Sequence, residues 1–200
     1  MCNQFQLPSL AEIKKYLVTD LNLPLVEPTN NLPQSQPVFP KAAAPVLLYQ
    51  NNQLQLVPKT WGYPSPFDSK KVIFNARVER FFETKPSMWD KSFAKSRCII
   101  IAEQFWESGH QTYTANQRTY HERYSFRDPN APLTLIAGIY QDGYFSMVTT
   151  KPNSNMTPIH DRMPLVITPA ELRRWLFQNF TNLIDRSSMP LAVNKMPQRK

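Results

Sequence analysis

Short apolar segments separated by turn-forming residues constrain the fold of this chain more than any other feature of its sequence. The run Cys98-Ile99-Ile100-Ile101 is apolar without alternation, which is typical of a buried strand. Two other apolar runs flank the pair Asn51-Asn52, and this arrangement predicts a β-hairpin. Strands are predicted over residues 46–49, 54–57, 72–76, 98–101, 120–126, 133–140, 144–150 and 163–167.

Helical signals are fewer and shorter than the strand signals. Ser9 and Glu12 have the spacing of a capping box, which predicts a short first helix. Thr168 and Glu171 repeat that spacing with a proline after the threonine, which predicts the start of another helix. A surface helix is predicted over residues 87–95. Many strands with a few short helices indicate an α+β domain built on a curved, barrel-like, mostly antiparallel sheet.

The length of 200 residues suits one domain with its own core, and residues 1–200 are predicted to form a single domain. Residues 22–45 are rich in proline, and this segment is expected to wrap the domain surface. Residues 187–200 are expected to form a mobile tail. The two cysteines, Cys2 and Cys98, are too few for a disulfide framework or a four-cysteine zinc site.

Charge and hydropathy limit the partners that this chain can have. It carries 23 basic and 15 acidic residues, a net charge of +8, and most of the excess falls after residue 60. Such an excess favours an anionic partner. No segment approaches the roughly 18–20 apolar residues of a membrane span, and no secretory signal is visible. These features predict a cytoplasmic protein that does not act at a membrane.

Cys2 follows the initiator methionine and offers chemistry that no internal cysteine has. If Met1 is removed, Cys2 carries an α-amine beside its thiol. The ordinary pKa is about 7.7–8.0 for such an amine and about 8.5 for the thiol, so part of each group is nucleophilic near neutral pH. The amine can attack an aldehyde to give a Schiff base, and the thiol can then close a five-membered thiazolidine ring. The alternative is that a cysteine at this position has no function.

Polar residues beside apolar segments are the other candidates for chemistry. Asn75 and Arg77 end the strand predicted over 72–76, where polar groups often serve a site. The alternative is that Asn75 caps a turn and Arg77 is solvated. Glu107 follows two aromatic residues, and apolar surroundings raise a carboxyl pKa toward the range useful for proton transfer. A carboxylate paired with an arginine at the rim of the fold is equally consistent with this pattern.

Among the three histidines, His160 precedes a predicted strand and can shuttle protons near neutral pH. The alternative is a capping or hydrogen-bonded core histidine. His110 and His121 lie in polar stretches and are interpreted as surface residues. No spacing of histidine, cysteine and acidic residues resembles a metal site, and no glycine-rich phosphate loop is present, so neither a metal nor a cofactor is predicted.

Three aromatic residues, Trp61, Tyr63 and Phe67, lie on a segment stiffened by proline. Aromatic rings beside basic side chains suit single-stranded nucleic acid, because bases stack on the rings while phosphates meet lysine and arginine. Packing in the core is the alternative for one or two of these rings.

Taken together, the motifs resemble the SOS-response-associated peptidase (SRAP) family, the abasic site processing proteins. The resemblance runs from Met1 to the helix predicted after Thr168. The motifs are Met1-Cys2 with Phe5, Trp61-Gly62, Asn75-Ala76-Arg77-Val78-Glu79, Arg97-Cys98 through Phe105-Trp106-Glu107, Ala137-Gly138, and His160-Asp161-Arg162-Met163-Pro164. Each motif alone is weak, but their order together with Cys2 is specific.

The resemblance implies an SRAP-like fold and a reaction with DNA. In this family the methionine is removed and Cys2 bonds covalently to the ring-opened aldehyde of an abasic site in single-stranded DNA. By the same resemblance, Asn75 orients the Cys2 amine or the sugar, and Glu107 and His160 move protons. Contacts to DNA are expected from Arg77, Trp61 and Arg162.

Further expectations concern assembly and alternative activities. The protein is expected to be a monomer associated with the bacterial nucleoid, and reversal of the cross-link or strand cleavage would make it a lyase. Two other functions are compatible with the same residues. One is a cysteine peptidase that releases Met1, with Glu107 and His160 assisting. The other is a non-catalytic binder of single-stranded DNA.

Some positions depart from the usual residues of the family, namely Asn3, Gln4, Ile101, Gln104 and Ser108. Asparagine tolerates a positive φ better than most residues, so Asn3 is expected to keep the turn that the family makes with glycine. Gln4 stands where the family has arginine, which removes one charge that could meet a phosphate. Weaker DNA binding is therefore expected, while the chemistry is unaffected.

Overall fold

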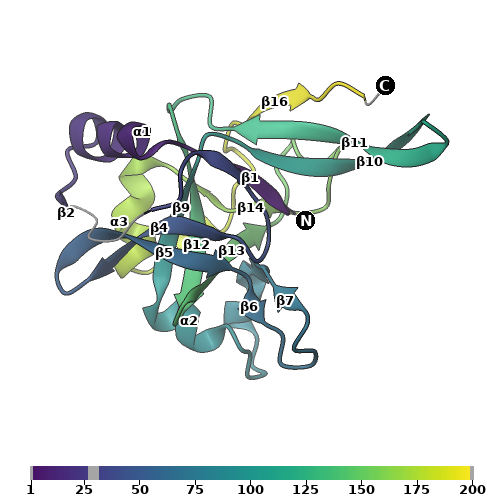
Figure 1. Ribbon diagram of the computed structural model, residues 1–200. Helices are drawn as coiled ribbons and strands as arrows, with labels where there is room; N and C mark the ends of the chain where they lie inside the picture. Colours follow the sequence, from purple (N-terminus) through teal and green to yellow (C-terminus); the bar gives the residue numbers. More distant parts are fainter. Residues whose placement is uncertain (1, 27–31, 199–200) are drawn as a thin grey trace.

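The computed structural model describes residues 2–26 and 32–198, and strands make up most of it (Figure 1). The larger sheet has the order β14 (Met163–Pro164), β13 (Tyr144–Thr150), β12 (Thr134–Gln141), β9 (Arg97–Ala102), β4 (Ala43–Gln50), β5 (Gln53–Trp61) and β2 (Leu25–Val26). Because β13 also pairs with β5, the strands β13, β12, β9, β4 and β5 close into a ring. This confirms the α+β class and the barrel-like, mostly antiparallel sheet.

Three short strands lie beside the ring, namely β6 (Tyr63–Pro64), β7 (Val72–Ile73) and β8 (Asn75–Arg77). The sequence predicts one strand over 72–76, but the chain changes partners at Phe74. β7 pairs with β6, whereas β8 pairs in parallel with β13. The Phe74 carbonyl accepts hydrogen bonds from the Trp61 indole (2.9 Å) and from the Met147 backbone (3.0 Å). These two bonds fix the point where the strand is divided.

The segment 163–167 is divided in the same way, into β14 and β15 (Val166–Ile167). Leu165 lies between them and bonds to both neighbouring strands. Its backbone N–H donates to Val148 O at 2.9 Å, and its carbonyl accepts from Ala137 N at 2.9 Å. As a result β14 pairs with β13 and β15 pairs with β12.

The second sheet has the order β16 (Ala192–Lys195), β11 (Arg118–Arg127), β10 (Phe105–Ala115), β1 (Gln4–Leu7) and β3 (Gln36–Val38). β10 and β11 form a hairpin arm that projects from the body of the molecule (Figure 1). The sequence predicts only β11, over the shorter range 120–126. The strands β10 and β1 hold the start of the chain against the ring, so this sheet matters for the site.

Two segments predicted to be irregular contribute strands. The prediction of a mobile tail over 187–200 is wrong for residues 192–195, because these form β16 and pair with β11. Residues 199–200 lie outside the described residues. The proline-rich segment 22–45 carries β2, which pairs with β5, and β3, which pairs with β1. Within that segment, 27–31 lie outside the described residues.

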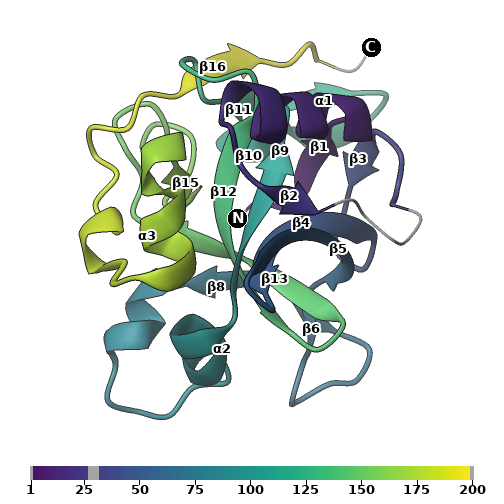
Figure 2. The same ribbon diagram turned by 90° about the vertical axis from the view of Figure 1, so that its left-hand side faces the viewer.

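Helical segments surround the sheets (Figure 2). They are α1 (Leu10–Lys14) with a π-helical continuation (Lys15–Asp20), α2 (Asp90–Lys95), α3 (Leu172–Phe177), and 3-10 turns over Val78–Phe82, Pro169–Glu171 and Thr181–Leu183. Both predicted capping boxes are confirmed, at Ser9 and at Thr168. The surface helix predicted over 87–95 is shorter, and it buries Phe93 completely. No helix among the described residues is both long and apolar enough to cross a bilayer.

The predicted hairpin is confirmed as β4 and β5. Asn51 and Asn52 connect the strands with φ values of 51° and 61°, a backbone region that asparagine enters more readily than most residues. Asn3, which was expected to keep a left-handed turn, is exposed and is not among the described residues with a positive φ. The expectation for Asn3 is therefore wrong.

Trp61 joins the ring to the second sheet. Its side chain is fully buried and lies 5.1 Å from the Phe5 ring of β1 and 6.2 Å from the Phe145 ring of β13. Burying an aromatic side chain of this size stabilises a fold by about 2–3 kcal/mol. The start of the chain is thus held against the ring by the core itself.

Candidate active site

Cys2 lies two residues before β1 and is fully buried. Its thiol donates a hydrogen bond to the Gln4 carbonyl at 3.5 Å, and its own carbonyl accepts one from Asn75 Nδ2 at 2.8 Å. Burial, followed by the negative charge of Glu107, raises the pKa of the Cys2 thiol well above its ordinary value. The thiol is therefore protonated near neutral pH and needs a base before it can attack.

Asn75 reaches Cys2 from β8, which is held on the ring by β13 in the register Met147↔Asn75. The carboxamide is 8 % exposed, and its Oδ1 accepts no hydrogen bond from the described residues. A buried acceptor without a donor costs about 1–3 kcal/mol. An amine or hydroxyl group bound beside Cys2 would supply the missing donor.

Glu107 lies on β10, next to the strand that follows Cys2. β1 and β10 pair in the register Gln4↔Trp106, so the next residue of β10 is brought to the side of Cys2. Glu107 as a whole is 3 % exposed. Burial, with a further contribution from the charge of Asp161, raises its pKa to about 7. A carboxyl group with such a pKa can both donate and accept a proton near neutral pH.

His160 lies in the loop before β14. The Arg162 backbone N–H donates to its Nδ1 at 3.0 Å. Partial burial is the main cause that lowers the pKa of His160. Asp161, whose Oδ1 lies 2.9 Å from Nδ1, acts in the opposite direction. The ring is thus neutral at neutral pH and can serve as a base.

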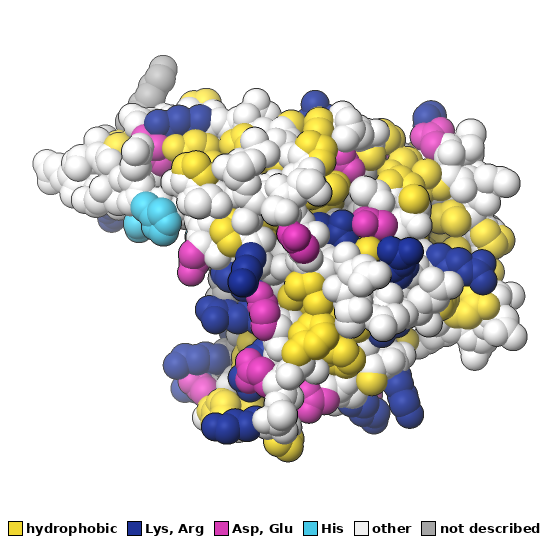
Figure 3. Space-filling view, turned by 180° about the vertical axis from the view of Figure 1, so that it is seen from behind, with side chains coloured by type: hydrophobic (Ala, Val, Ile, Leu, Met, Phe, Trp, Pro, Cys, Tyr) yellow, Lys and Arg dark blue, Asp and Glu magenta, His cyan; other side chains and the backbone are white. Residues whose placement is uncertain are grey.

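His110 is a site residue that the sequence analysis missed. Its ring stacks on that of His160, with centroids 6.3 Å apart and planes at 14°. Regular alternation from Glu107 would point His110 to the opposite face of β10, but the register of β10 and β11 shifts between Ser108 and Thr112. No sequence pattern signals that irregularity. Figure 3 shows histidine side chains under the projecting arm, above a hollow bordered by both basic and acidic side chains.

The four predicted catalytic positions are thus placed by different contacts. The Cys2 carbonyl accepts a hydrogen bond from the Asn75 side chain, and the Glu107 charge raises the pKa of the Cys2 thiol. His160 is connected less directly, through its stack on His110 of β10 and through Asp161, whose charge acts on Glu107. Met1 lies outside the described residues, so its predicted removal stays a prediction.

The three predicted DNA contacts differ in accessibility. Arg77 is exposed and lies two residues after Asn75 on β8, so both side chains leave the same face of that strand. Arg162 is 8 % exposed, and its guanidinium binds both carboxylate oxygens of Glu79 at 2.8 Å. Trp61 is fully buried. Arg162 and Trp61 therefore hold the fold together, and the expectation that they meet DNA is not supported.

Two of the three aromatic rings expected to meet nucleic acid, those of Trp61 and Tyr63, are packed in the core instead. Tyr63 is 3 % exposed and bonds Ser92 at 3.0 Å, whereas Phe67 is 92 % exposed. Of the three rings on this segment, only that of Phe67 offers a face to a nucleic-acid base.

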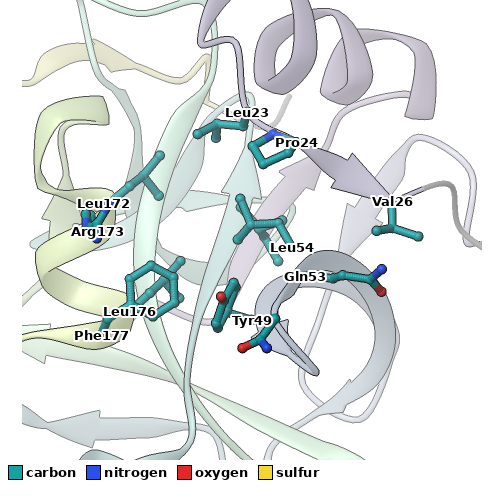
Figure 4. A pocket seen from close by; sticks show the side chains of 12 residues that line it. Leu23, Pro24, Val26, Tyr49, Gln53, Leu54, Leu172, Arg173, Leu176 and Phe177 are labelled. Carbon is teal, nitrogen blue, oxygen red and sulfur yellow. The ribbon is translucent and has the colours of Figure 1, made fainter.

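A cavity of about 660 Å³ lies away from these residues, between the β4–β5 hairpin and α3 (Figure 4). Its lining is mostly apolar and includes Leu23, Leu54, Leu176 and Phe177. None of the candidate catalytic residues borders it, and it offers no pair of acid and base. Among the described residues, no three histidine, cysteine or acidic side chains form a group that could hold a metal ion.

The fold and the site define a class of protein: a small α+β domain in which a cysteine at the start of the chain is buried beside a carboxyl group with a raised pKa. The chain belongs to the SOS response associated peptidase (SRAP) family, whose model matches residues 1–197.

Curated relatives agree with this assignment, and solved structures share the fold. The chain is 28 % identical over 189 residues to the abasic site processing protein YoqW of Bacillus subtilis, covering 88 % of this chain and 80 % of YoqW. It is 26 % identical to the abasic site processing protein YedK of Escherichia coli, covering 72 % and 65 %. A protein from Bordetella bronchiseptica shares the fold with a TM-score of 0.73 at 18 % identity, covering 98 % and 100 %. A protein from Bacteroides thetaiotaomicron has a TM-score of 0.71 at 21 % identity, covering 98 % and 92 %.

Proposed function

We propose that this protein recognises abasic sites in single-stranded DNA and forms a covalent thiazolidine cross-link through Cys2 after removal of Met1. The observation that carries the proposal is the burial of the Cys2 thiol beside the Glu107 carboxyl and the Asn75 carboxamide. The names of the curated relatives, which are abasic site processing proteins, support the choice of substrate.

The reaction of the open aldehyde with Cys2 needs three proton movements. The α-amine of Cys2 adds to the sugar aldehyde, and a proton moves from nitrogen to oxygen to give a carbinolamine. The hydroxyl group of the carbinolamine leaves as water when it receives a proton, which gives a protonated imine. The sulfur then adds to the carbon of this protonated imine while the thiol proton is removed, and the nitrogen keeps its hydrogen. The net change is the loss of one water molecule and the formation of one C–N and one C–S bond.

Glu107 has the protonation behaviour that these steps require. Near neutral pH a pKa of about 7 leaves a fraction of the carboxyl groups protonated and able to donate to the departing hydroxyl. The carboxylate formed in that step can accept the thiol proton, which the raised pKa of Cys2 otherwise retains. One side chain thus acts first as acid and then as base.

Asn75 and His160 have separate roles in the proposal. Asn75 fixes the Cys2 carbonyl through Nδ2, and its Oδ1 accepts a hydrogen bond from the attacking amine. His160, neutral near pH 7, takes the proton from the C1 hydroxyl of the sugar and returns it to the ring oxygen, whose bond to C1 breaks as the aldehyde forms.

Single-stranded DNA suits this site better than a duplex. The aldehyde must reach a fully buried thiol, and a stacked, paired strand would have to be disrupted first. The exposed Arg77 and the basic side chains around the hollow in Figure 3 can follow a phosphate backbone without reading sequence.

The two alternative functions, a cysteine peptidase and a non-catalytic binder of single-stranded DNA, are not supported by a comparable structural observation. Cysteine peptidases depend on a thiol whose pKa is lowered, whereas burial raises that of Cys2. A binder without chemistry has no use for a buried carboxyl group with a pKa of about 7 beside that thiol. Release of Met1 remains part of the proposal as the step that exposes the amine.

A denaturing gel tests the proposed function. The protein is incubated with a single-stranded oligonucleotide that contains one abasic site, and the retarded, denaturation-resistant band is quantified for the wild type, Cys2→Ala and Cys98→Ser. We expect the band for the wild type and for Cys98→Ser, and none for Cys2→Ala. A band of equal intensity for Cys2→Ala, or no band for the wild type with a verified Cys2 terminus, would overturn the proposal.

A further inference from the structure

Arg123 lies against the start of the chain although 119 residues separate it from Gln4. The registers Gln4↔Trp106 and Ser108↔Arg123 place the side chains of Gln4, Trp106 and Arg123 on the same face of the second sheet. The Arg123 Nη2 group donates to the Gln4 carboxamide oxygen, and the guanidinium carbon lies 6.0 Å from the centre of the Trp106 ring. Two side chains thus fix the guanidinium in one place.

Within the described part of the chain, no carboxylate balances the charge of Arg123. Among residues 2–26 and 32–198, the polar partner of its guanidinium is the neutral carboxamide of Gln4, and no acidic group lies within ion-pair distance. Arg162 and Arg186, by contrast, each form an ion pair with a glutamate. The adjacent Glu122 is bound by Lys195 at 2.6 Å. Arg123 therefore keeps a full positive charge, half-buried and held in position.

The position of this charge relates it to the candidate active site. Gln4 uses its backbone carbonyl to accept the Cys2 thiol hydrogen and its side chain to accept from Arg123. Trp106, beneath the guanidinium, directly precedes Glu107 on β10, and successive side chains of a strand leave opposite faces. An anion bound by Arg123 would thus lie on the strands that carry the thiol and the carboxyl group, across the sheet from Glu107.

We infer that Arg123 is a phosphate-binding residue that anchors the DNA backbone at β1, on the face of the second sheet opposite Glu107; this inference rests on the proposed function. A guanidinium has five N–H donors, and the bond to Gln4 uses one, so an edge is left for bidentate contact with a phosphate. The neutral Gln4 holds the group without cancelling its charge. The positive charge that is absent at position 4, where this chain has glutamine and the family has arginine, is thus provided by Arg123 from β11.

The test measures noncovalent binding, which is independent of the cross-link. A fluorescent single-stranded oligonucleotide with one tetrahydrofuran residue, an abasic analogue that has no aldehyde, is titrated at a series of salt concentrations. The slope of log K against log [salt] reports the number of phosphates contacted, at about 0.7 per phosphate for single strands. We expect Arg123→Gln to weaken binding and to reduce the slope by about 0.7, while Arg123→Lys keeps most of the slope.

Two further variants separate the charge from the fold. Gln4→Glu keeps Arg123 in place but neutralises it, and we expect the same loss of slope. Arg173→Gln removes an equal charge on α3, at the apolar cavity, and should leave the slope unchanged. A slope that is unchanged in both Arg123→Gln and Gln4→Glu would overturn the inference, and so would a wild type that does not bind the oligonucleotide.

The outcomes distinguish this inference from the proposed function. A wild type that cross-links true abasic DNA while Arg123→Gln keeps the full slope contradicts only the role of Arg123. A wild type that loses slope on Arg123→Gln but never cross-links contradicts only the covalent chemistry.

Discussion

Cys2 and Cys98 are both 0 % exposed, and burial raises the thiol pKa of each, yet their surroundings differ. Cys98 lies in β9 inside the ring, where an added Cβ on Gly138 would come within 2.9 Å of its sulfur. Cys2 lies where the second sheet meets the ring, beside Glu107 and Asn75. Burial alone therefore does not mark a reactive thiol in this fold. The difference lies in the polar groups around the sulfur and in the place of Cys2 at the start of the chain.

The largest expected effect separates the amine of Cys2 from its thiol. Cys2→Ser keeps an α-amine after removal of Met1 but replaces sulfur with a weaker nucleophile. We expect an imine that borohydride traps and that hydrolyses without it, and no adduct that survives heating. Cys98→Ser should give the wild-type adduct in every condition. A heat-stable adduct from Cys2→Ser would show that ring closure by sulfur is not required.

A second effect concerns the Glu107 carboxyl group, which lies beside Cys2 and not beside Cys98. Glu107→Gln cannot accept the thiol proton, and general acid–base groups contribute about 10²–10⁴ in rate. We expect the rate of cross-linking, followed by quenched time points on gels, to fall within that range, with affinity for the tetrahydrofuran oligonucleotide nearly unchanged. A rate within threefold of the wild type would remove Glu107 from the mechanism.

The same carboxyl group links stability to pH. Its pKa is about 7 in the folded protein against 4.5 in the unfolded chain, so between these values the folded state holds the proton more tightly. Stability should thus fall as pH rises from about 4.5 to 7, by about 3 kcal/mol at most. In thermal melts recorded across this pH range, the stability of Glu107→Gln should not show this part of the decline. Parallel melting curves for the two proteins would contradict the raised pKa.

A smaller effect is expected inside the ring. Gly138→Ala pushes a methyl group against the Cys98 sulfur and should destabilise the fold by about 1–3 kcal/mol. Chemical denaturation measures this change. Because the nearest atoms to the added group belong to Cys98 and Ile100, and β13 separates Gly138 from Asn75, the folded variant should cross-link at the wild-type rate. Loss of cross-linking in a folded Gly138→Ala protein would mean that the two regions are coupled.

The smallest expected effect concerns His110. Its charge is one of the causes that lower the pKa of His160, although burial is the largest. His110→Phe keeps a ring for stacking but removes the charge, so the pKa of His160 should rise and the acid limb of the rate profile should move to higher pH. NMR titration of His160 measures the pKa directly. Arg118→Ala, which removes a charge at the far end of the arm, serves as the control and should leave it unchanged.

Local patterns predicted much of this fold because each depends on neighbouring residues. The hairpin at Asn51-Asn52 and the capping box at Ser9 are examples, and both are confirmed. β1 escaped prediction because its pairing partners, β10 and β3, lie far away in the sequence. β10 pairs with the adjacent β11, and it escaped prediction because its own pattern of polar and apolar residues is mixed. The divisions at Phe74 and Leu165 likewise depend on bonds to distant strands.

At the site, likewise, the type of a residue could be predicted to matter, but its surroundings could not. Glu107 and Asn75 were identified from their motifs, and the structure brings both to Cys2. Trp61 and Arg162 were expected at DNA, but residue type does not reveal that one fills the core and the other binds Glu79. His110 and Arg123 depend on a β-bulge and a cross-strand register, which no local pattern predicts.

Mass spectrometry of the cross-linked peptide tests the central claim most directly. The adduct is digested with protease and nuclease, alkylated with iodoacetamide, and sequenced by fragmentation. We expect a peptide that begins at Cys2, carries the sugar remnant with loss of one water, and resists alkylation because nitrogen and sulfur are both in the ring. A remnant on a lysine, a peptide that retains Met1, or a Cys2 sulfur that is still alkylated would contradict the thiazolidine.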